Sequence, residues 1–290
     1  MTRHIAHVPL RWADMDSYGH VNNVVYLRYL QEARVDMLFV HAPKRGAGSF
    51  QRGSVVSRHD IGYLAPLRFR ARPLQVETWV REVRNSTFTL GYEVVDADDD
   101  ARRVYACATT TLVPYDLERG RARRLTAEEK AVLEGHLETD GPVPRTRRPD
   151  PDGKPDKKHV YQCAVRFDDL DSYGHVNNVI FAEYLQEARI DFAQRHLLGV
   201  VDAHQGSVVA GQSIDYLAPV PFRTQPLQVD VWVTHIGESS FEVAYDVRDE
   251  ERLYARATST LVTYDVGAQR PRKITAAEHA ALEPFMGEEQ

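Results

Sequence analysis

Two aspartates, Asp16 and Asp171, stand in loops with the same sequence, Asp-Ser-Tyr-Gly-His-Val-Asn-Asn. A carboxylate can activate water as a general base or attack a carbonyl group as a nucleophile. Each loop runs into a segment with helical periodicity, and the free N–H groups at a helix N-terminus stabilise an oxygen that gains negative charge. The aspartate and the helix start together suit the hydrolysis of an activated acyl group such as a thioester.

A structural role for these acidic residues is the main alternative. Asp16 and Asp171 could cap the helices that follow them, since an acidic side chain stabilises a helix N-terminus by about 0.3–1 kcal/mol. We expect the neighbouring Asp14 and Asp169 to act as caps or to lie exposed to solvent. The residue types alone leave capping and catalysis equally open for Asp16 and Asp171.

Glycine and histidine follow each aspartate within the loop. His20 and His175 could take part in the chemistry, or they could be neutral residues that tie the loop to the backbone. Gly19 and Gly174 are expected to permit a positive φ angle or the close approach of an acyl group. All four are therefore candidate residues of the same two sites.

A helix is expected after each loop, because apolar residues recur three or four positions apart. Asn22 or Asn23 stands where the N-cap of the first helix should be, and Asn177 or Asn178 does so in the second. The apolar positions are Tyr26, Tyr29, Leu30, Ala33 and Met37 in the first helix, and Phe181, Tyr184, Leu185, Ala188 and Phe192 in the second.

The loop and its helix belong to an internal repeat. Residues 11–36 read RWADMDSYGHVNNVVYLRYLQEARVD and residues 166–191 read RFDDLDSYGHVNNVIFAEYLQEARID, an offset of 155 (171 − 16). The match continues downstream, where Tyr63-Leu-Ala-Pro recurs as Tyr216-Leu-Ala-Pro. Each half therefore carries its own copy of the candidate site.

A segment rich in proline and charge separates the two copies. Residues 140–158 read DGPVPRTRRPDPDGKPDKK, a composition typical of an extended, solvated linker. The sequence therefore predicts one domain at residues 1–139, a linker at 140–158 and a second domain at 159–290. A chain of 290 residues is long enough for two such cores.

Strand patterns follow each helix. In the first copy, hydrophobic and polar residues alternate over residues 74–81 and 88–94, and a run rich in Thr, Ala and Val covers 105–113. A short helix is expected at 126–133, with its copy at 275–282. The fold class is α+β, in which each domain has an antiparallel sheet wrapped around one long central helix.

The pattern Asp-x-x-Gly-His-Val-Asn-Asn-x-x-Tyr, on a loop between a strand and a helix, resembles the hotdog-fold acyl-CoA thioesterases of the 4-hydroxybenzoyl-CoA thioesterase type. It is also similar to the plant acyl-ACP thioesterases. The resemblance covers nearly all of both halves and omits only the linker and the ends. It implies two fused hotdog thioesterase domains that form an intramolecular pseudo-dimer, a hydrolase acting on acyl thioesters, and a place in fatty acid metabolism.

The resemblance also implies roles for particular residues. The catalytic carboxylate of the family falls on Asp16 and Asp171. The backbone N–H that polarises the thioester carbonyl falls on Asn23 and Asn178. Within this family, catalysis therefore becomes the preferred role of the two aspartates over helix capping.

In the acyl-ACP branch, a histidine of this loop also takes part in catalysis, and that histidine matches His20 and His175. That branch has an asparagine two residues after the aspartate, whereas this chain has Tyr18 and Tyr173. The departure weakens the acyl-ACP assignment more than the assignment as a thioesterase.

Other candidate residues have ordinary structural explanations. Ser54 and Ser207 precede an apolar pair and lack a histidine at a spacing that would make them nucleophiles. Charges on the helix are expected to be solvated or paired. These are Glu32, Arg34 and Asp36, with their copies Glu187, Arg189 and Asp191. A grip on coenzyme A phosphates by Arg68, Arg70, Arg72 and Arg84 is only weakly indicated, since the second half keeps Arg223 alone.

Bulk properties exclude several classes. The net charge of −6 gives no general attraction for nucleic acid. Without an apolar stretch of signal-peptide or membrane-spanning length, we expect a cytoplasmic protein that does not enter a membrane. Cys107 and Cys163 share no metal-ligand spacing, which favours reduced thiols in the core and no metal or cofactor.

The predicted partner is an acyl-CoA substrate, and homo-oligomers remain open. A hydratase acting on acyl thioesters is one rival, although aspartate and histidine are four residues apart (20 − 16) with no intervening Asn-Pro, unlike such enzymes. A non-enzymatic acyl-CoA-binding module is another, although no DNA-binding extension accompanies it. The carrier, coenzyme A or acyl carrier protein, stays undecided, as does the role of the aspartate as base or nucleophile.

Overall fold

The structure is a computed structural model that describes residues 3–42, 50, 53–96, 102–116, 118–148, 153–201 and 205–287. Contacts between Cα atoms divide the chain into two compact units, Met1–Arg145 and Thr146–Gln290, named unit 1 and unit 2 below. The boundary falls within the segment expected as a linker.

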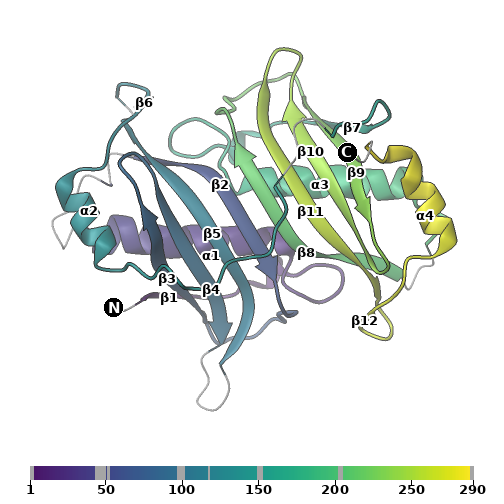
Figure 1. Cartoon of the computed structure of the whole chain (residues 1–290), viewed down its shortest axis with the longest axis horizontal. Coiled ribbons are helices and arrows are strands. Elements are labelled where there is room, and N and C mark those ends of the chain that lie inside the picture. The colour runs from purple at the N-terminus through teal and green to yellow at the C-terminus, as the bar shows by residue number, and fades with distance from the viewer. Residues whose placement is uncertain are drawn as a thin grey trace. The chain divides into compact units, whose positions relative to one another are not determined.

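Unit 1 contains a five-stranded antiparallel sheet in the order β1-β3-β4-β5-β2 (Figure 1). Its strands are β1 (His4–Val8), β2 (Ser54–Tyr63), β3 (Leu74–Val83), β4 (Phe88–Asp96) and β5 (Arg103–Asp116), and the short β6 (Arg121–Ala122) pairs with β5. Its helices are the 3₁₀ turn η1 (Trp12–Asp14), α1 (Asn23–Val35), the π-helical turn η2 (Asp36–His41) and α2 (Ala127–Glu134).

Unit 2 repeats this topology in the order β7-β9-β10-β11-β8. Its strands are β7 (His159–Cys163), β8 (Gln205–Tyr216), β9 (Leu227–Ile236), β10 (Ser240–Arg248), β11 (Leu253–Asp265) and β12 (Arg270–Pro271). Its helices are η5 (Phe167–Asp169), α3 (Ile180–His196), α4 (Ala276–Leu282) and η6 (Glu283–Phe285). An antiparallel sheet with one long helix is therefore confirmed for each unit.

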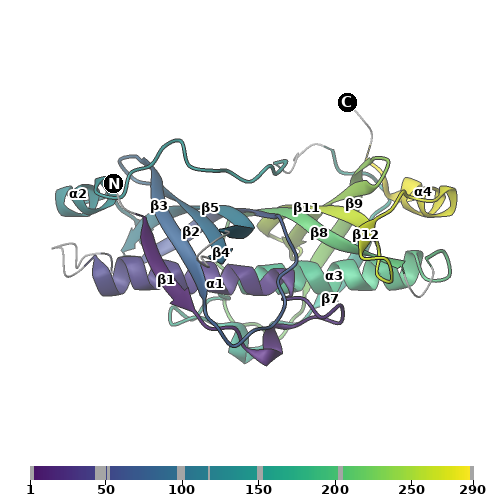
Figure 2. The same ribbon diagram turned by 90° about the horizontal axis from the view of Figure 1, so that it is seen from below.

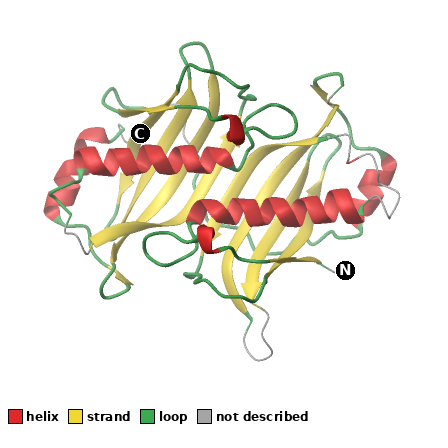
Figure 3. Ribbon diagram, turned by 180° about the vertical axis from the view of Figure 1, so that it is seen from behind, coloured by secondary structure: helices red, strands yellow, loops and turns green. Residues whose placement is uncertain are grey.

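The long helix of each unit lies on one face of its own sheet (Figures 2 and 3). All ten apolar helix positions predicted from the sequence are buried. Leu27 and Leu30 of α1 and Leu185 of α3 are fully enclosed. Burial of each such side chain is worth about 1.5–3 kcal/mol, so this apolar face fixes the helix on the sheet. Cys107 and Cys163 are buried free thiols, as expected.

One face of the unit 1 sheet carries a buried tryptophan. Trp79 alternates with the apolar residues of β3 and is completely buried. The guanidinium of Arg3 lies 4.1 Å from the centre of its ring, and a Cβ on Gly141 would lie 2.5 Å from its indole nitrogen. Arg3 and the chain after α2 therefore cover this residue.

The linker segment is likewise less solvated than its composition suggested. Gly141 is buried against unit 1, where its carbonyl accepts a hydrogen bond from Arg81. Lys154 donates to Asp230 at 2.6 Å and to Asp246 at 3.0 Å in unit 2. Both carboxylates are buried, so the lysine supplies a charge that those acids need. In its described parts, the segment packs at these points and is not a free tether.

The short helices after each sheet match the predicted positions. Thr126 and Thr275 are their N-caps, and each exchanges hydrogen bonds with the glutamate three residues later. Among the helices that the structure describes, none is both long and apolar enough to cross a membrane.

Candidate active site

The loop before α1 is closed by the side chain of Asp16. Its Oδ1 accepts hydrogen bonds from the backbone N–H of Tyr18 at 2.9 Å and of His20 at 3.1 Å. The backbone N–H of Asp16 donates to the carbonyl of His20 at 2.7 Å. Among the described residues, no hydrogen bond reaches Oδ2. One oxygen therefore orders the loop and leaves the other for a ligand or water.

Asp171 has the same geometry in unit 2. Its Oδ1 accepts from the N–H of Tyr173 at 2.8 Å and, more weakly, of His175 at 3.4 Å. Its own N–H donates to the carbonyl of His175 at 2.8 Å. The structure therefore presents the carboxylate in the same way twice.

The start of α1 is capped by another residue. Asn22 Oδ1 accepts from the N–H of Val24, so the alternative that Asp16 caps this helix is wrong. Within the described part of the chain, the N–H of Asn23 donates to no residue, as expected at the first turn of a helix. Tyr63, on β2, donates its hydroxyl to the carbonyl of Asn23 at 2.8 Å. The helix start thus has a donor that could serve a substrate and a tyrosine that holds it in position.

The equivalent turn in unit 2 is similar, although α3 itself begins at Ile180. Asn177 Oδ1 accepts from the N–H of Val179 at 3.3 Å. Tyr216 donates to the carbonyl of Asn178 at 2.8 Å. The first asparagine of the pair therefore makes the same bond in both units, although it is the N-cap residue only of α1, and the N-cap residue of α3 is Val179.

Asp14 and Asp169 act as caps and also bind a tyrosine of the long helix. Asp169 Oδ2 accepts from the N–H of Arg166 at 2.7 Å and from the hydroxyl of Tyr184 at 2.6 Å. Asp14 makes the same contact with Tyr29 at 2.7 Å. The capping role is confirmed for both, on the 3₁₀ turns η1 and η5 that precede the long helices, and Asp169 is only 7% exposed.

Four tyrosines were missed as positioning residues by the sequence analysis. Tyr29 and Tyr184 were assigned to the apolar helix face because a tyrosine ring fits there, and the hydrogen bond at its tip has no sequence pattern. Tyr63 and Tyr216 were visible only as part of the repeated Tyr-Leu-Ala-Pro. Burial, followed by the bonded aspartate, raises the pKa of Tyr29 and of Tyr184, so both hydroxyls remain donors.

The imidazole rings of the loop histidines do not hold the loop to the backbone. Their backbone groups bond to the aspartate, but the imidazoles of His20 and His175 make no hydrogen bond with any residue that the structure describes. Both side chains are half-buried. They therefore lie beside the aspartate with their ring nitrogens available to a ligand.

The glycines of the loop are required by its backbone. Gly19 has φ of 72° and Gly174 has φ of 74°, a region that other residues adopt at a cost. No atom lies within 4 Å of where a Cβ would stand on either residue. The positive φ is confirmed, and the space beside each glycine is open towards any ligand.

Tyr18 and Tyr173 stand where the acyl-ACP branch has asparagine. Burial and the charge of the neighbouring Asp16 raise the pKa of Tyr18, and Asp171 has the same effect on Tyr173. Each hydroxyl therefore stays protonated near the carboxylate.

One helix charge is not solvated as expected. Arg34 is only 7% exposed, and its Nη1 is buried without a hydrogen-bond partner in the described structure. Around it stand His59 and Tyr92, and Thr110 Oγ1 lies 2.8 Å from His59 Nδ1. Burial, and secondarily the charge of Arg34, lowers the pKa of His59 well below its ordinary value. The expectation for Arg34 is therefore wrong, because the arginine lies in the core beside a row of polar side chains, which are His59, Tyr92 and Thr110. This set is called the polar row below.

Arg189, the copy of Arg34, also has its Nη1 buried without a hydrogen-bond partner in the described structure. The other charges of the set behave as structural groups. Glu32 and Glu187 are exposed, and Asp36 and Asp191 each pair with a histidine. Ser54 and Ser207 lie half-buried on strands. Three of the arginines considered for coenzyme A phosphates have acidic partners, since Arg70 and Arg72 share Asp96 and Arg84 bonds to Glu82.

Each site thus combines an ordered carboxylate, a histidine and a helix N-terminus on a sheet-and-helix scaffold. These are parts of an acyl-transfer hydrolase. The sequence model of the thioesterase-like superfamily matches residues 10–135 and again 165–284. The chain belongs to the thioesterase-like superfamily, and thioester hydrolysis is the general activity that this membership supports.

Solved structures show the same fold. A protein of Lactobacillus plantarum assigned as an oleoyl thioesterase superposes with a TM-score of 0.72 at 16% identity, covering 90% of this chain and 96% of that one. The 12:0-ACP thioesterase of Umbellularia californica gives 0.67 at 15% identity, covering 93% and 94%. An acyl-ACP thioesterase of Bacteroides thetaiotaomicron gives 0.65 at 16% identity, covering 89% and 97%. These neighbours are hotdog-fold thioesterases, and identities this low establish the fold alone.

A curated relative, the uncharacterized protein YsmA of Bacillus subtilis (strain 168), is 34% identical over 85 residues. The match covers 29% of this chain and 56% of the relative. This chain therefore spans about half the length of that relative.

Proposed function

We propose that the protein hydrolyses acyl-CoA thioesters to a free carboxylic acid and coenzyme A, with Asp16 and Asp171 as the catalytic carboxylates. The two units are the two hotdog domains, joined by residues 140–158. The observation that carries the proposal is the loop geometry, in which Oδ1 of each aspartate is held by two backbone N–H groups beside a helix start.

In unit 1, Asp16 acts as a general base on water. The water oxygen attacks the thioester carbonyl carbon and its proton passes to the carboxylate of Asp16. The C–S bond then breaks, and the proton is returned to the departing sulfur of coenzyme A. No covalent enzyme intermediate is formed.

The negative charge that develops on the thioester oxygen needs donors. The N–H of Asn23 supplies one, and a donor of this kind is worth about 3–4 kcal/mol in comparable sites. The imidazole of His20 supplies a second polar contact, and the open space beside Gly19 receives the acyl carbonyl. Asn178, His175 and Gly174 do the same in unit 2.

The test is the release of free thiol from purified protein given short, medium, long and aromatic acyl-CoAs. The decisive variant is Asp16→Asn combined with Asp171→Asn, because asparagine keeps the Oδ1 acceptor that closes each loop and removes the base. We expect a loss of about 10²–10⁴-fold in kcat with the fold retained by circular dichroism. Thiol release at the original rate would overturn the assignment of the aspartates.

Two further measurements separate the rival functions. A binding module would take up acyl-CoA saturably without releasing thiol, and a hydratase would change the absorbance of an enoyl-CoA without releasing thiol. Parallel assays with the same acyl group on coenzyme A and on acyl carrier protein decide the carrier. Faster turnover of the acyl-ACP would contradict the proposed substrate while leaving the hydrolase in place.

A further inference from the structure

A second cluster of polar side chains lies at the opposite end of α1 from the catalytic loop, about 20 Å away along the helix. His4 reaches it from β1, Asp36 from the end of α1, and His41 from the last turn of η2. His4 Nε2 lies 2.8 Å and His41 Nδ1 lies 3.5 Å from Asp36 Oδ2. One ligand atom from each of the three residues lies within 4.8 Å of the others.

A third histidine borders the same place. His136, just after α2, lines a small cavity together with His4, His41 and Met37. The cavity volume is about 10 Å³, which is room for one water-sized species. His136 is only 7% exposed. Three imidazoles thus line a cavity with room for one water-sized species, and two of them, His4 and His41, also belong to the group with Asp36.

The composition of this cluster suits a particular class of ion. Imidazole nitrogen and carboxylate oxygen are the ligands that zinc and its neighbours among the divalent transition metals accept in tetrahedral sites. Bonds of about 2.0–2.2 Å separate tetrahedral ligand atoms by about 3.3–3.5 Å, which matches the distance from His41 to Asp36. The distance from His4 to Asp36 would open by about half an ångström. The bond between His41 Nδ1 and the carbonyl of Asp36, now 2.9 Å, would be exchanged for the ion.

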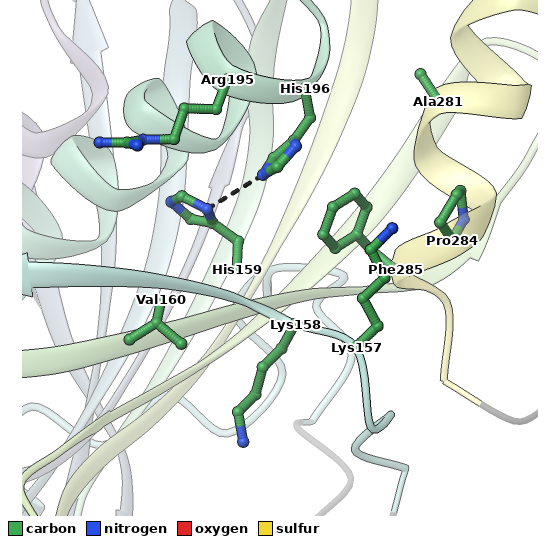
Figure 4. A pocket seen from close by; sticks show the side chains of 9 residues that line it. All are labelled: Lys157, Lys158, His159, Val160, Arg195, His196, Ala281, Pro284 and Phe285. Carbon is green, nitrogen blue, oxygen red and sulfur yellow. Dashed lines mark hydrogen bonds between the residues drawn. The ribbon is translucent and has the colours of Figure 1, made fainter.

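Unit 2 provides an internal comparison. His159, Asp191 and His196 stand 155 residues after His4, Asp36 and His41 (159 − 4, 191 − 36, 196 − 41). His159 Nε2 lies 2.9 Å from Asp191 Oδ2, and the rings of His159 and His196 are hydrogen-bonded at 3.2 Å (Figure 4). The three residues of the cluster are therefore repeated.

Two substitutions distinguish the unit 2 cluster. Arg195, which replaces Val40, donates its Nε to both oxygens of Asp191, at 3.0 and 2.8 Å. Phe285, which replaces His136, stacks on His196 with ring centres 4.5 Å apart (Figure 4). The carboxylate already has a cation, and the histidine that lines the cavity in unit 1 has become an aromatic ring.

We propose that unit 1 binds one divalent transition-metal ion of the zinc class through His4, Asp36 and His41, and that unit 2 does not. The ion joins β1 to the end of α1 and to the last turn of η2. It therefore acts on stability and stands apart from the catalytic loops.

The test uses untagged full-length protein, treated with a chelator and desalted, then titrated with Zn²⁺ by calorimetry and with Co²⁺ by visible absorption. We expect one ion per chain, the strong d–d bands of tetrahedral cobalt, and a raised unfolding temperature. His41→Ala removes a ligand whose side chain is 45% exposed, so the fold should survive. Val40→Arg places in unit 1 the cation that pairs with the equivalent carboxylate of unit 2.

Each of these variants is expected to weaken binding by at least about 10-fold. His196→Ala is the matched control, because it makes the His41→Ala change in unit 2 and should leave one ion bound with unchanged affinity. Absence of saturable binding in the wild type, binding unaffected by His41→Ala and Val40→Arg, or binding lost on His196→Ala would each overturn the proposal. The Asp16→Asn and Asp171→Asn variant should bind the ion normally, so this result is independent of the proposed function.

Discussion

Unit 1 and unit 2 carry the same loop on different supports. In both, the aspartate closes the loop through one oxygen, an asparagine side chain accepts from the backbone N–H two residues later, and a tyrosine bonds to the carbonyl of the next asparagine. The polar row behind the helix differs, because Gln212 and Ser259 replace His59 and Thr110. The far end of the helix differs too, through Arg195 and Phe285.

The difference teaches that the residues touching the loop are repeated, whereas those that only stabilise the unit have diverged. The two units should therefore share their chemistry and differ in how they respond to acid, to metal ions and to packing changes. Four experiments test this comparison, from the largest expected effect to the smallest.

The first compares the two aspartates separately. If both sites work, Asp16→Asn and Asp171→Asn should each leave about half of the thiol release, while the double variant loses about 10²–10⁴-fold. The control is Glu32→Gln with Glu187→Gln, exposed helix residues that should leave kcat unchanged. A single variant that abolishes turnover would show that only one unit is catalytic.

The second compares the tryptophans on the outer faces. A Cβ on Gly91 would lie 2.4 Å from the Trp79 ring, whereas Ala244 already stands opposite Trp232 in unit 2. Gly91→Ala should lower the free energy of unfolding by about 1–3 kcal/mol through overpacking. Ala244→Gly should cost at most about 1 kcal/mol. Urea unfolding measures both, and equal effects would contradict the close packing around Trp79.

The third compares the tyrosine–aspartate pairs. Tyr184→Phe leaves the buried Asp169 with one hydrogen bond fewer and should cost about 1–3 kcal/mol of unfolding free energy. Tyr29→Phe should cost less, because Asp14 is more exposed and water can replace the hydroxyl. Thermal unfolding of the two variants side by side gives the order. A larger loss of stability for Tyr29→Phe would contradict the argument that burial of the bonded aspartate decides the cost.

The fourth concerns pH. The pKa of His59 is lower in the folded protein than in the unfolded chain, so the unfolded chain binds the proton first as pH falls. The stability from neutral His59 is present above its unfolded pKa and is lost below it, by at most about 1.4 kcal/mol per pH unit. His59→Gln, which places the unit 2 residue in unit 1, should reduce the stability loss between about pH 7.5 and about pH 5.5. An unchanged loss would mean that His59 does not face the buried Arg34.

Much of the fold followed from periodicity. The apolar positions of α1 and α3, the strand alternation and the threonine caps are local patterns that repeat in both halves. Trp79 could not be predicted as buried, because the group that covers it, Gly141, comes 62 residues later (141 − 79) in a segment that looks solvated. The burial of Arg34 was missed for a related reason. A charged residue on a helix is usually exposed, and the polar side chains that surround Arg34 come from strands of the sheet on which the helix packs.

The candidate site, like the fold, could be predicted from the sequence only in part. The repeated loop indicated Asp16, Asp171 and their neighbours, but it left capping and catalysis open for the aspartates. Tertiary structure removed helix capping by placing Asn22 at the N-cap. It also brought Tyr63, 40 residues after Asn23, to the helix start.

The sequence by itself determined the duplicated loop, the helix behind it and the alternation of the strands that follow, because these depend on residues close together in the chain. Only the tertiary structure decided the strand order, which oxygen of each aspartate is occupied, which tyrosines hold the helix start, and that His4, Asp36 and His41 meet in one cluster. The reason is physical: hydrogen bonds and metal coordination act over a few ångströms, and the chain brings those atoms together only when the sheet closes on the helix.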